Sequence, residues 1–146
     1  MREPHDVDDE TAAYILQTRM PFEGLRQVAS QIAGALVLSA SGADTASPDH
    51  PLLDSALELY REAVDGVRAA RPTKRARIHH RCLLDASTAL GVALTAARTN
   101  LEADFVMVPL RCAYDHLRKG AETLPGFEMV AFAQGCCALH HRRAAS

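Results

Sequence analysis

Three cysteine–histidine pairs near the end of the chain are the residues best suited to chemistry. In each pair the cysteine precedes the histidine by four positions, and the pairs are Cys112–His116, Cys136–His140 and Cys137–His141. Residues four apart on a helix lie on one face, so each pair can present a thiolate and an imidazole to the same ion. Such ligands suit zinc, copper and haem iron. One hypothesis is therefore a metal- or haem-binding helical bundle whose ligands are Cys112, His116, Cys136 and His140, completed across a dimer interface.

Helix geometry weighs against a single site within one chain. If the last three helices run antiparallel, His116 and His140 lie roughly 16 Å apart along the bundle axis at ~1.5 Å per residue, whereas Cys112 and Cys136 lie within roughly 5 Å. A buried cysteine also behaves as a small hydrophobic residue. This packing role is favoured for the four cysteines, which are Cys82, Cys112, Cys136 and Cys137. We therefore predict no cofactor, with Zn, Cu or haem as the alternative.

A second candidate site is the basic stretch from residue 71 to residue 81, which contains no acid. Positive charge at the start of a helix opposes the helix dipole, so a negative group is expected nearby. The favoured source is the chain itself, either the acids of the preceding helix or the acidic segment 3–10, because most charge runs are solvated faces. The alternative is an anionic ligand such as a phosphate or carboxylate. Its candidate anion-binding residues are Arg75, Arg77, His79, His80 and Arg81.

Length and composition favour one soluble domain over residues 1–146. The net charge is −2 and the longest strongly apolar run, residues 32–38, is far short of the ~20 residues that span a bilayer. These features predict no nucleic-acid partner and no membrane insertion. The first thirty residues lack a secretory pattern, so we expect a cytoplasmic protein with reduced thiols.

Apolar residues recur every three to four positions, which predicts an all-α, antiparallel up-and-down bundle of four to five main helices with a short N-terminal helix. The expected helices span roughly residues 9–20, 21–38, 52–70, 73–98, 99–123 and 127–141, with Thr99 as the cap of the fifth and a break at residues 124–126. Apolar seams are expected through Leu53 and Val67, through Leu83 and Leu90, and through Val106, Leu110, Ala113 and Leu117. Pro21 is expected to separate the first two, and Pro109 to kink the fifth or delay its start. Residues 1–8 are expected to be flexible and 39–51 to form a surface loop.

No nucleophile elbow, phosphate loop or Glu-x-x-His pair is present, so the sequence does not predict an enzyme. The helices at 52–70, 78–97 and 127–139 carry apolar or small residues on more than one face. Apolar surface that a bundle of this size leaves uncovered favours a partner. The leading hypothesis is a non-enzymatic interaction or regulatory module that self-associates, with a dimer favoured. An unknown protein partner or a small anionic ligand are the alternatives.

Overall fold

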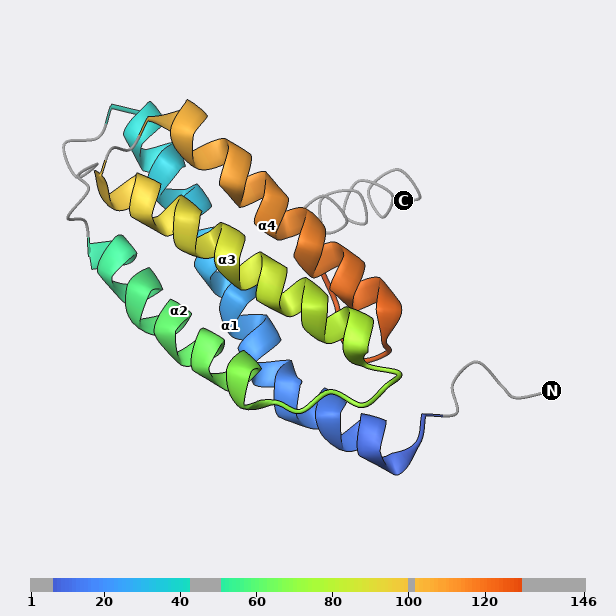
Figure 1. The fold of residues 1–146 in the computed structure, drawn as a ribbon. Coiled ribbons are helices and arrows are strands. Elements are labelled where there is room, and N and C mark those ends of the chain that lie inside the picture. The colour runs from blue at the N-terminus through green and yellow to red at the C-terminus, as the bar shows by residue number, and fades with distance from the viewer. Residues whose placement is uncertain (1–6, 43–50, 100–101, 130–146) are drawn as a thin grey trace, which may run out of the picture.

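The computed structural model describes residues 7–42, 51–99 and 102–129, and these residues form a helical bundle. Its helices are α1 (Asp9–Ala40), α2 (Pro51–Ala69), α3 (Arg77–Thr99) and α4 (Ala103–Thr123) (Figure 1). No strand occurs in the described ranges, and the predicted all-α fold is confirmed. None of the helices in these ranges combines the length and the apolarity that a membrane span requires.

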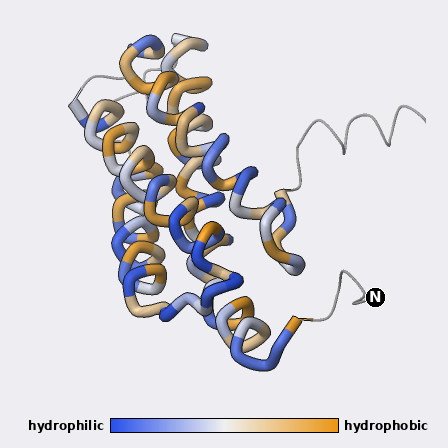
Figure 2. Tube along the Cα trace, turned by 45° about the vertical axis from the view of Figure 1, so that its right-hand side comes forward, coloured by the Kyte–Doolittle hydropathy of each residue, from blue (hydrophilic) through white to orange (hydrophobic). Residues whose placement is uncertain are grey.

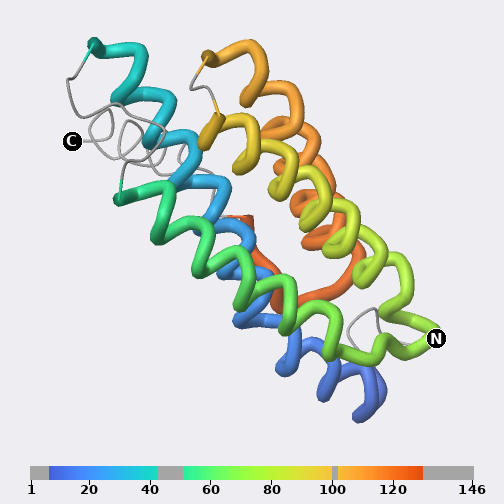
Figure 3. Tube along the Cα trace, turned by 60° about the vertical axis from the view of Figure 1, so that its left-hand side comes forward, coloured from blue at the N-terminus to red at the C-terminus, as the bar shows by residue number. Residues whose placement is uncertain are grey.

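The bundle consists of two antiparallel helix pairs, α1 with α2 and α3 with α4, which Figure 3 shows side by side. Hydrophobic and hydrophilic residues alternate around each helix (Figure 2), and the hydrophobic ones form one buried cluster. The predicted apolar seams lie in this cluster. Its fully buried members include Leu53, Val67, Leu83, Leu90, Val106 and Leu117.

The prediction of a break at Pro21 is wrong, because α1 continues through this residue from Asp9 to Ala40. A proline inside a helix removes one backbone hydrogen bond and costs ~3 kcal/mol. Tertiary packing offsets that cost here. Pro21 is buried, the adjacent Phe22 is fully buried, and the Pro21 ring lies against Gly66 of α2.

The connection between α3 and α4 also differs from the prediction. Thr99 was expected to cap the next helix, but it is the last residue of α3. The N-cap of α4 is Glu102, which makes no capping hydrogen bond through its side chain. The helix then begins at Ala103 and continues through Pro109, so that proline does not delay its start.

The chain turns back onto the bundle after α4, at the break predicted for residues 124–126. Leu124 and Phe127 are buried, and Gly126 adopts the left-handed conformation with φ of +94°. The predicted helix was expected to begin at Phe127, but residues 127–129 are not helical. The remainder of that predicted helix lies outside the described residues, as do residues 1–6 of the predicted flexible segment and residues 43–50 of the predicted surface loop.

We predict that Gly66→Ala destabilises the protein. A Cβ at this position would lie 2.6 Å from Cγ of Pro21, and the proline ring cannot rotate away. The expected loss in the free energy of unfolding is about 1–2 kcal/mol, although alanine is the better helix former. Urea denaturation measures it.

The matched control is Gly34→Ala, where the nearest atom, Cδ2 of Leu52, would lie at an ordinary 3.6 Å. That variant is expected to gain up to about 1 kcal/mol through helix propensity. A Gly66→Ala variant as stable as the wild type would show that α1 and α2 are not held this closely at Pro21.

Candidate functional site

A cluster of polar and aromatic side chains lies where the first turn of α3 meets α1. His79 is fully buried, and its Nδ1 lies 2.9 Å from the hydroxyl oxygen of Tyr14. The same hydroxyl lies 3.3 Å from Nδ1 of His80. The hydroxyl has one proton, so between two neutral imidazoles it donates to one ring and accepts from the N–H of the other. Tyr14 therefore joins α1 to both histidines.

Burial sets the protonation state of this cluster. Together with the neighbouring His80, it lowers the pKa of His79 to about 4, and burial also lowers the pKa of His80. Burial raises the pKa of Tyr14 well above its usual value. These directions follow from the cost of placing a charge in the apolar interior. At neutral pH the cluster is therefore uncharged.

The aromatic rings around His79 complete a contact between three segments of the chain. The imidazole of His79 lies 4.1 Å from the ring of Phe127, centre to centre, and Phe127 lies 5.1 Å from Phe22 of α1. Nε2 of His79 is buried and has no hydrogen-bond partner in the described part of the chain. The buried thiol of Cys82 is one turn further along α3, beside Gly120 of α4.

The candidate anion-binding residues do not share one surface. Arg75, Arg77 and Arg81 are exposed and His80 is half-buried, whereas His79 points into the core. The structure therefore leaves the imidazole of His79 out of any site that the arginine side chains form. Anion binding by the remaining residues stays a prediction.

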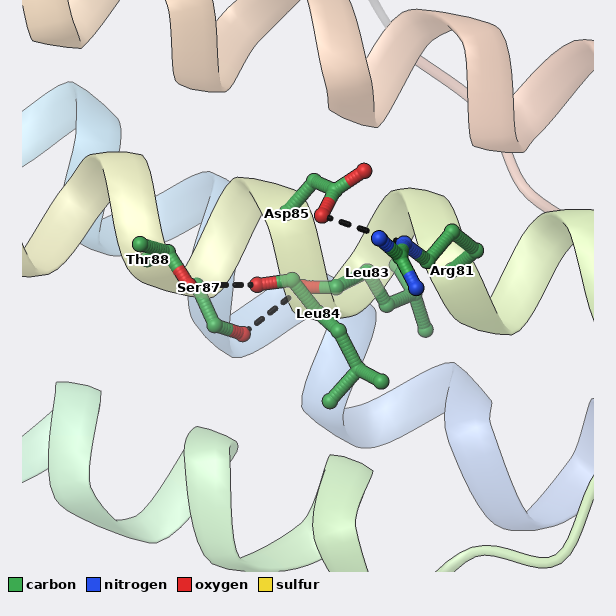
Figure 4. Close-up of polar contacts among 6 residues, drawn as sticks. All are labelled: Arg81, Leu83, Leu84, Asp85, Ser87 and Thr88. Carbon is green, nitrogen blue, oxygen red and sulfur yellow. Dashed lines mark hydrogen bonds and ion pairs between the residues drawn. The ribbon is translucent and has the colours of Figure 1, made fainter.

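Acids of the chain itself surround part of this basic stretch. Asp85 lies 3.5 Å from Nε of Arg81, on the side of α3 that faces α4 (Figure 4). Asp8 and Glu10 line the same hollow as Lys74 and Arg75. Hydrogen bonds from Thr11, with a smaller contribution from Arg75, hold the pKa of Asp8 below its usual value. Asp8 and Glu10 belong to the acidic segment 3–10 that was expected as a source of negative charge, whereas Asp85 of α3 itself was not expected. Neutralisation of the whole basic stretch by the chain itself stays a prediction.

The predicted metal ligands are only partly within the described residues. Cys112 and His116 line one groove between α3 and α4, as their spacing of four predicted, and Asp85 lines it from α3. No group of three or more His, Cys, Asp or Glu side chains within residues 7–42, 51–99 and 102–129 is arranged to hold a metal ion. Cys136 and His140 lie outside those ranges, so a metal site that includes them stays a prediction.

The packing role favoured for the cysteines holds for one of the two described. Cys82 is buried, but Cys112 is exposed. The reason is the register of α4, whose buried stripe is Val106, Leu110, Ala113 and Leu117. Cys112 precedes a member of that stripe by one residue, and one residue turns the side chain by about 100° around the helix.

The outer surface of α3 and α4 carries an apolar patch that sequence reasoning did not identify. Its exposed members are Val92 (55%), Phe105 (66%) and Val108 (73%). Two grooves meet at Val92. One, of about 540 Å³, is lined by Val92, Thr95, Ala96, Thr99 and Phe105. The other, of about 500 Å³, is lined by Asp85, Thr88, Ala89, Val92, Val108, Pro109, Cys112 and His116.

A signal for this patch was present in the sequence. Phe105 and Val108 lie beside the predicted seam of α4 rather than on it, so a helix buried on one face must expose them. We name the surface formed by the residues of these two grooves the α3/α4 face.

Comparisons of the chain with models of protein families, with curated proteins and with solved structures gave no match.

The histidine cluster predicts a stability that falls with acid. In the unfolded chain His79 has an ordinary pKa near 6.5, whereas in the folded protein the value is about 4. Between these values the unfolded state binds more protons, so stability is fully present above pH ~6.5 and declines as the pH falls toward 4. The expected loss from this residue is on the order of 2–3 kcal/mol. Urea denaturation at several pH values measures it.

The test compares His79→Gln with the wild type, because carboxylates also respond to acid. The variant loses the packing of the imidazole, but its deficit in free energy of unfolding should shrink as the pH falls from 7 to 4. His116→Gln, at a half-buried position of α4, is the control and should show a deficit that does not shrink in this way. A deficit of His79→Gln that is constant over this range would contradict the neutral, buried state of His79.

Proposed function

We propose that this protein is a non-enzymatic helical-bundle module that acts by self-association, with the α3/α4 face as the contact surface. The observation that carries the proposal is the gathering of Val92, Phe105 and Val108 on one side of the α3–α4 pair. Burying an apolar side chain of this size stabilises a contact by about 1.5–3 kcal/mol. A two-fold dimer uses the same face twice, so each buried residue contributes twice.

The setting of these residues supports a docking surface rather than scattered exposure. Single exposed apolar side chains are ordinary on soluble proteins. Here the three side chains border grooves of about 500 and 540 Å³ that are mostly lined by apolar or small residues. An aromatic side chain from a partner would find an apolar floor in either groove, as in the anchor pockets of protein interfaces.

The polar cluster inside the bundle supports a non-catalytic role. Tyr14 and His79 are the groups whose pKa values burial shifts most, and both lie in the core. A general acid or base must come within hydrogen-bond distance of its substrate. The contacts of Tyr14 and His79 instead join α1, α3 and the turn that contains Phe127.

We predict that Phe105→Ser weakens self-association by at least tenfold. The variant removes the largest exposed apolar side chain of the α3/α4 face and, by symmetry, removes it from both sides of the contact. Sedimentation velocity over a range of protein concentrations measures the monomer–dimer equilibrium. Circular dichroism confirms that the exposed substitution leaves the fold intact.

Val37→Ser is the matched control. Val37 lies near the end of α1 and is 68% exposed, close to the 66% of Phe105. This variant should associate as the wild type does. A wild-type protein that stays monomeric at every concentration, or an equal effect of the two substitutions, would refute self-association through the α3/α4 face.

A further inference from the structure

We infer that two copies of the chain pair through antiparallel α4 helices, with Val108 next to the two-fold axis and Asp104 of each copy opposite Arg111 of the other. This inference rests on the proposed self-association and specifies its geometry. It is carried by the placement of charged and apolar residues along the exposed side of α4.

Three exposed residues of α4 form a stripe facing away from the core. Asp104, Val108 and Arg111 follow one another at steps of four and three, which places them on one face of a helix. Neither Asp104 nor Arg111 takes part in an ion pair within the described part of the chain. The stripe thus presents an acid, a 73% exposed valine and a base in that order.

The order of these residues is self-complementary in the antiparallel sense. With Val108 at the axis, a residue four positions before it on one copy lies level with the residue four positions after it on the other. Asp104 therefore lies within one residue, ~1.5 Å along the axis, of the level of Arg111 of the second copy. The two-fold axis creates this contact between Asp104 and Arg111 twice. The two residues of each pair lie on the same flank of the paired helices.

Two other arrangements place like charges together. A parallel pairing of the α4 helices would set Asp104 against Asp104 and Arg111 against Arg111. An antiparallel pairing centred on Arg111 would set the two copies of Arg111 against each other. Like charges in contact across an interface are unfavourable, so both arrangements are disfavoured relative to the register that places the exposed apolar Val108 at the axis.

The same register fixes which residues of the second copy lie level with Phe105. Phe105 lies on the flank of α4 that faces α3, as do Pro109 and Cys112. In the proposed pairing it is level with Arg111 and Cys112 of the second copy. Phe105 therefore lies on the same flank as, and level with, the groove of about 500 Å³ that Ala89, Pro109 and Cys112 of the second copy line.

The overlap of the two helices is short. From Ala103 to Cys112 it covers about ten residues, or roughly 15 Å of helix. Interfaces of this size fall among the small ones that associate weakly and reversibly. Ion pairs at the rim of such an interface are screened by salt. We therefore expect a dimer that dissociates on dilution and weakens in high salt.

A charge-swap cycle tests the proposed ion pair. Asp104→Arg and Arg111→Asp alone each set like charges opposite one another and should weaken the dimer at least fivefold. The double variant D104R/R111D restores opposite charges and should recover most of the wild-type affinity. Sedimentation velocity at low salt measures all four proteins. A double variant that associates more weakly than either single variant would overturn the register.

The matched control lies further along the same helix. Asp115 and Arg118 form an ion pair at 3.0 Å within one chain and lie beyond the proposed overlap. The double variant D115R/R118D should therefore associate as the wild type does. A loss of affinity there equal to that of the single variants at residues 104 and 111 would also overturn the register.

Crosslinking tests the two-fold axis independently. In a background with Cys112, Cys136 and Cys137 replaced by serine, Val108→Cys should yield a disulfide-linked dimer under mild oxidation, and Arg118→Cys should not. A wild-type protein that is monomeric at all concentrations refutes self-association itself. A wild-type dimer that neither crosslinks at residue 108 nor recovers in the charge swap overturns the register alone and leaves self-association standing.

Discussion

The close approach of helices at small residues is the constraint on which the rest of this structure depends. Gly24 lies against Ala63, Gly66 lies against the ring of Pro21, and Gly120 lies beside Cys82. Helices that meet at such positions leave a thin layer between them, which alanine and leucine fill. The interior therefore has little room for further large side chains. Apolar residues such as Phe105 and Val108, which lie beside the seam of α4, are then left on the outer side of the α3–α4 pair.

The close spacing of the helices also bears on the polar cluster at the end of the bundle where α3 begins. At the first turn of α3, Tyr14 and His79 replace the leucine–alanine layers with a hydrogen bond and stacked rings. A neutral imidazole fits this place because it supplies a flat ring and a hydrogen-bonding nitrogen at once. Phe127 lies in the turn that follows α4 and packs against the imidazole of His79. Because Phe127 is buried, this turn is part of the core. The place of that turn therefore depends on packing against one buried imidazole.

The fold was largely predictable, because the spacing of apolar residues along the sequence is enough to place most of the buried ones. The seams through Leu53, Leu83 and Val106 are buried as expected, and the break after residue 123 lies where proline and glycine indicated it. Pro21 could not be placed correctly from local rules, since the room for its buried ring comes from the absence of a side chain at Gly66, forty-five residues away in the sequence. The candidate site was less predictable for the same reason. Whether His79 or Cys112 faces the core depends on helix register, and a single residue of register decides between burial and exposure.

The two faces of α4 show how one periodic sequence serves two purposes. Val106, Leu110 and Leu117 recur with the helical period and fix which side of α4 meets the core. Once that side is fixed, the residues between them have no freedom of direction, so Asp104, Val108 and Arg111 must line up on the far side. Core packing therefore determines the order of charge and apolar surface that another molecule meets. A shift of α4 by one residue would bury different side chains and would also remove Asp104, Val108 and Arg111 from the exposed side, so stability and the pattern of exposed side chains are set by the same register.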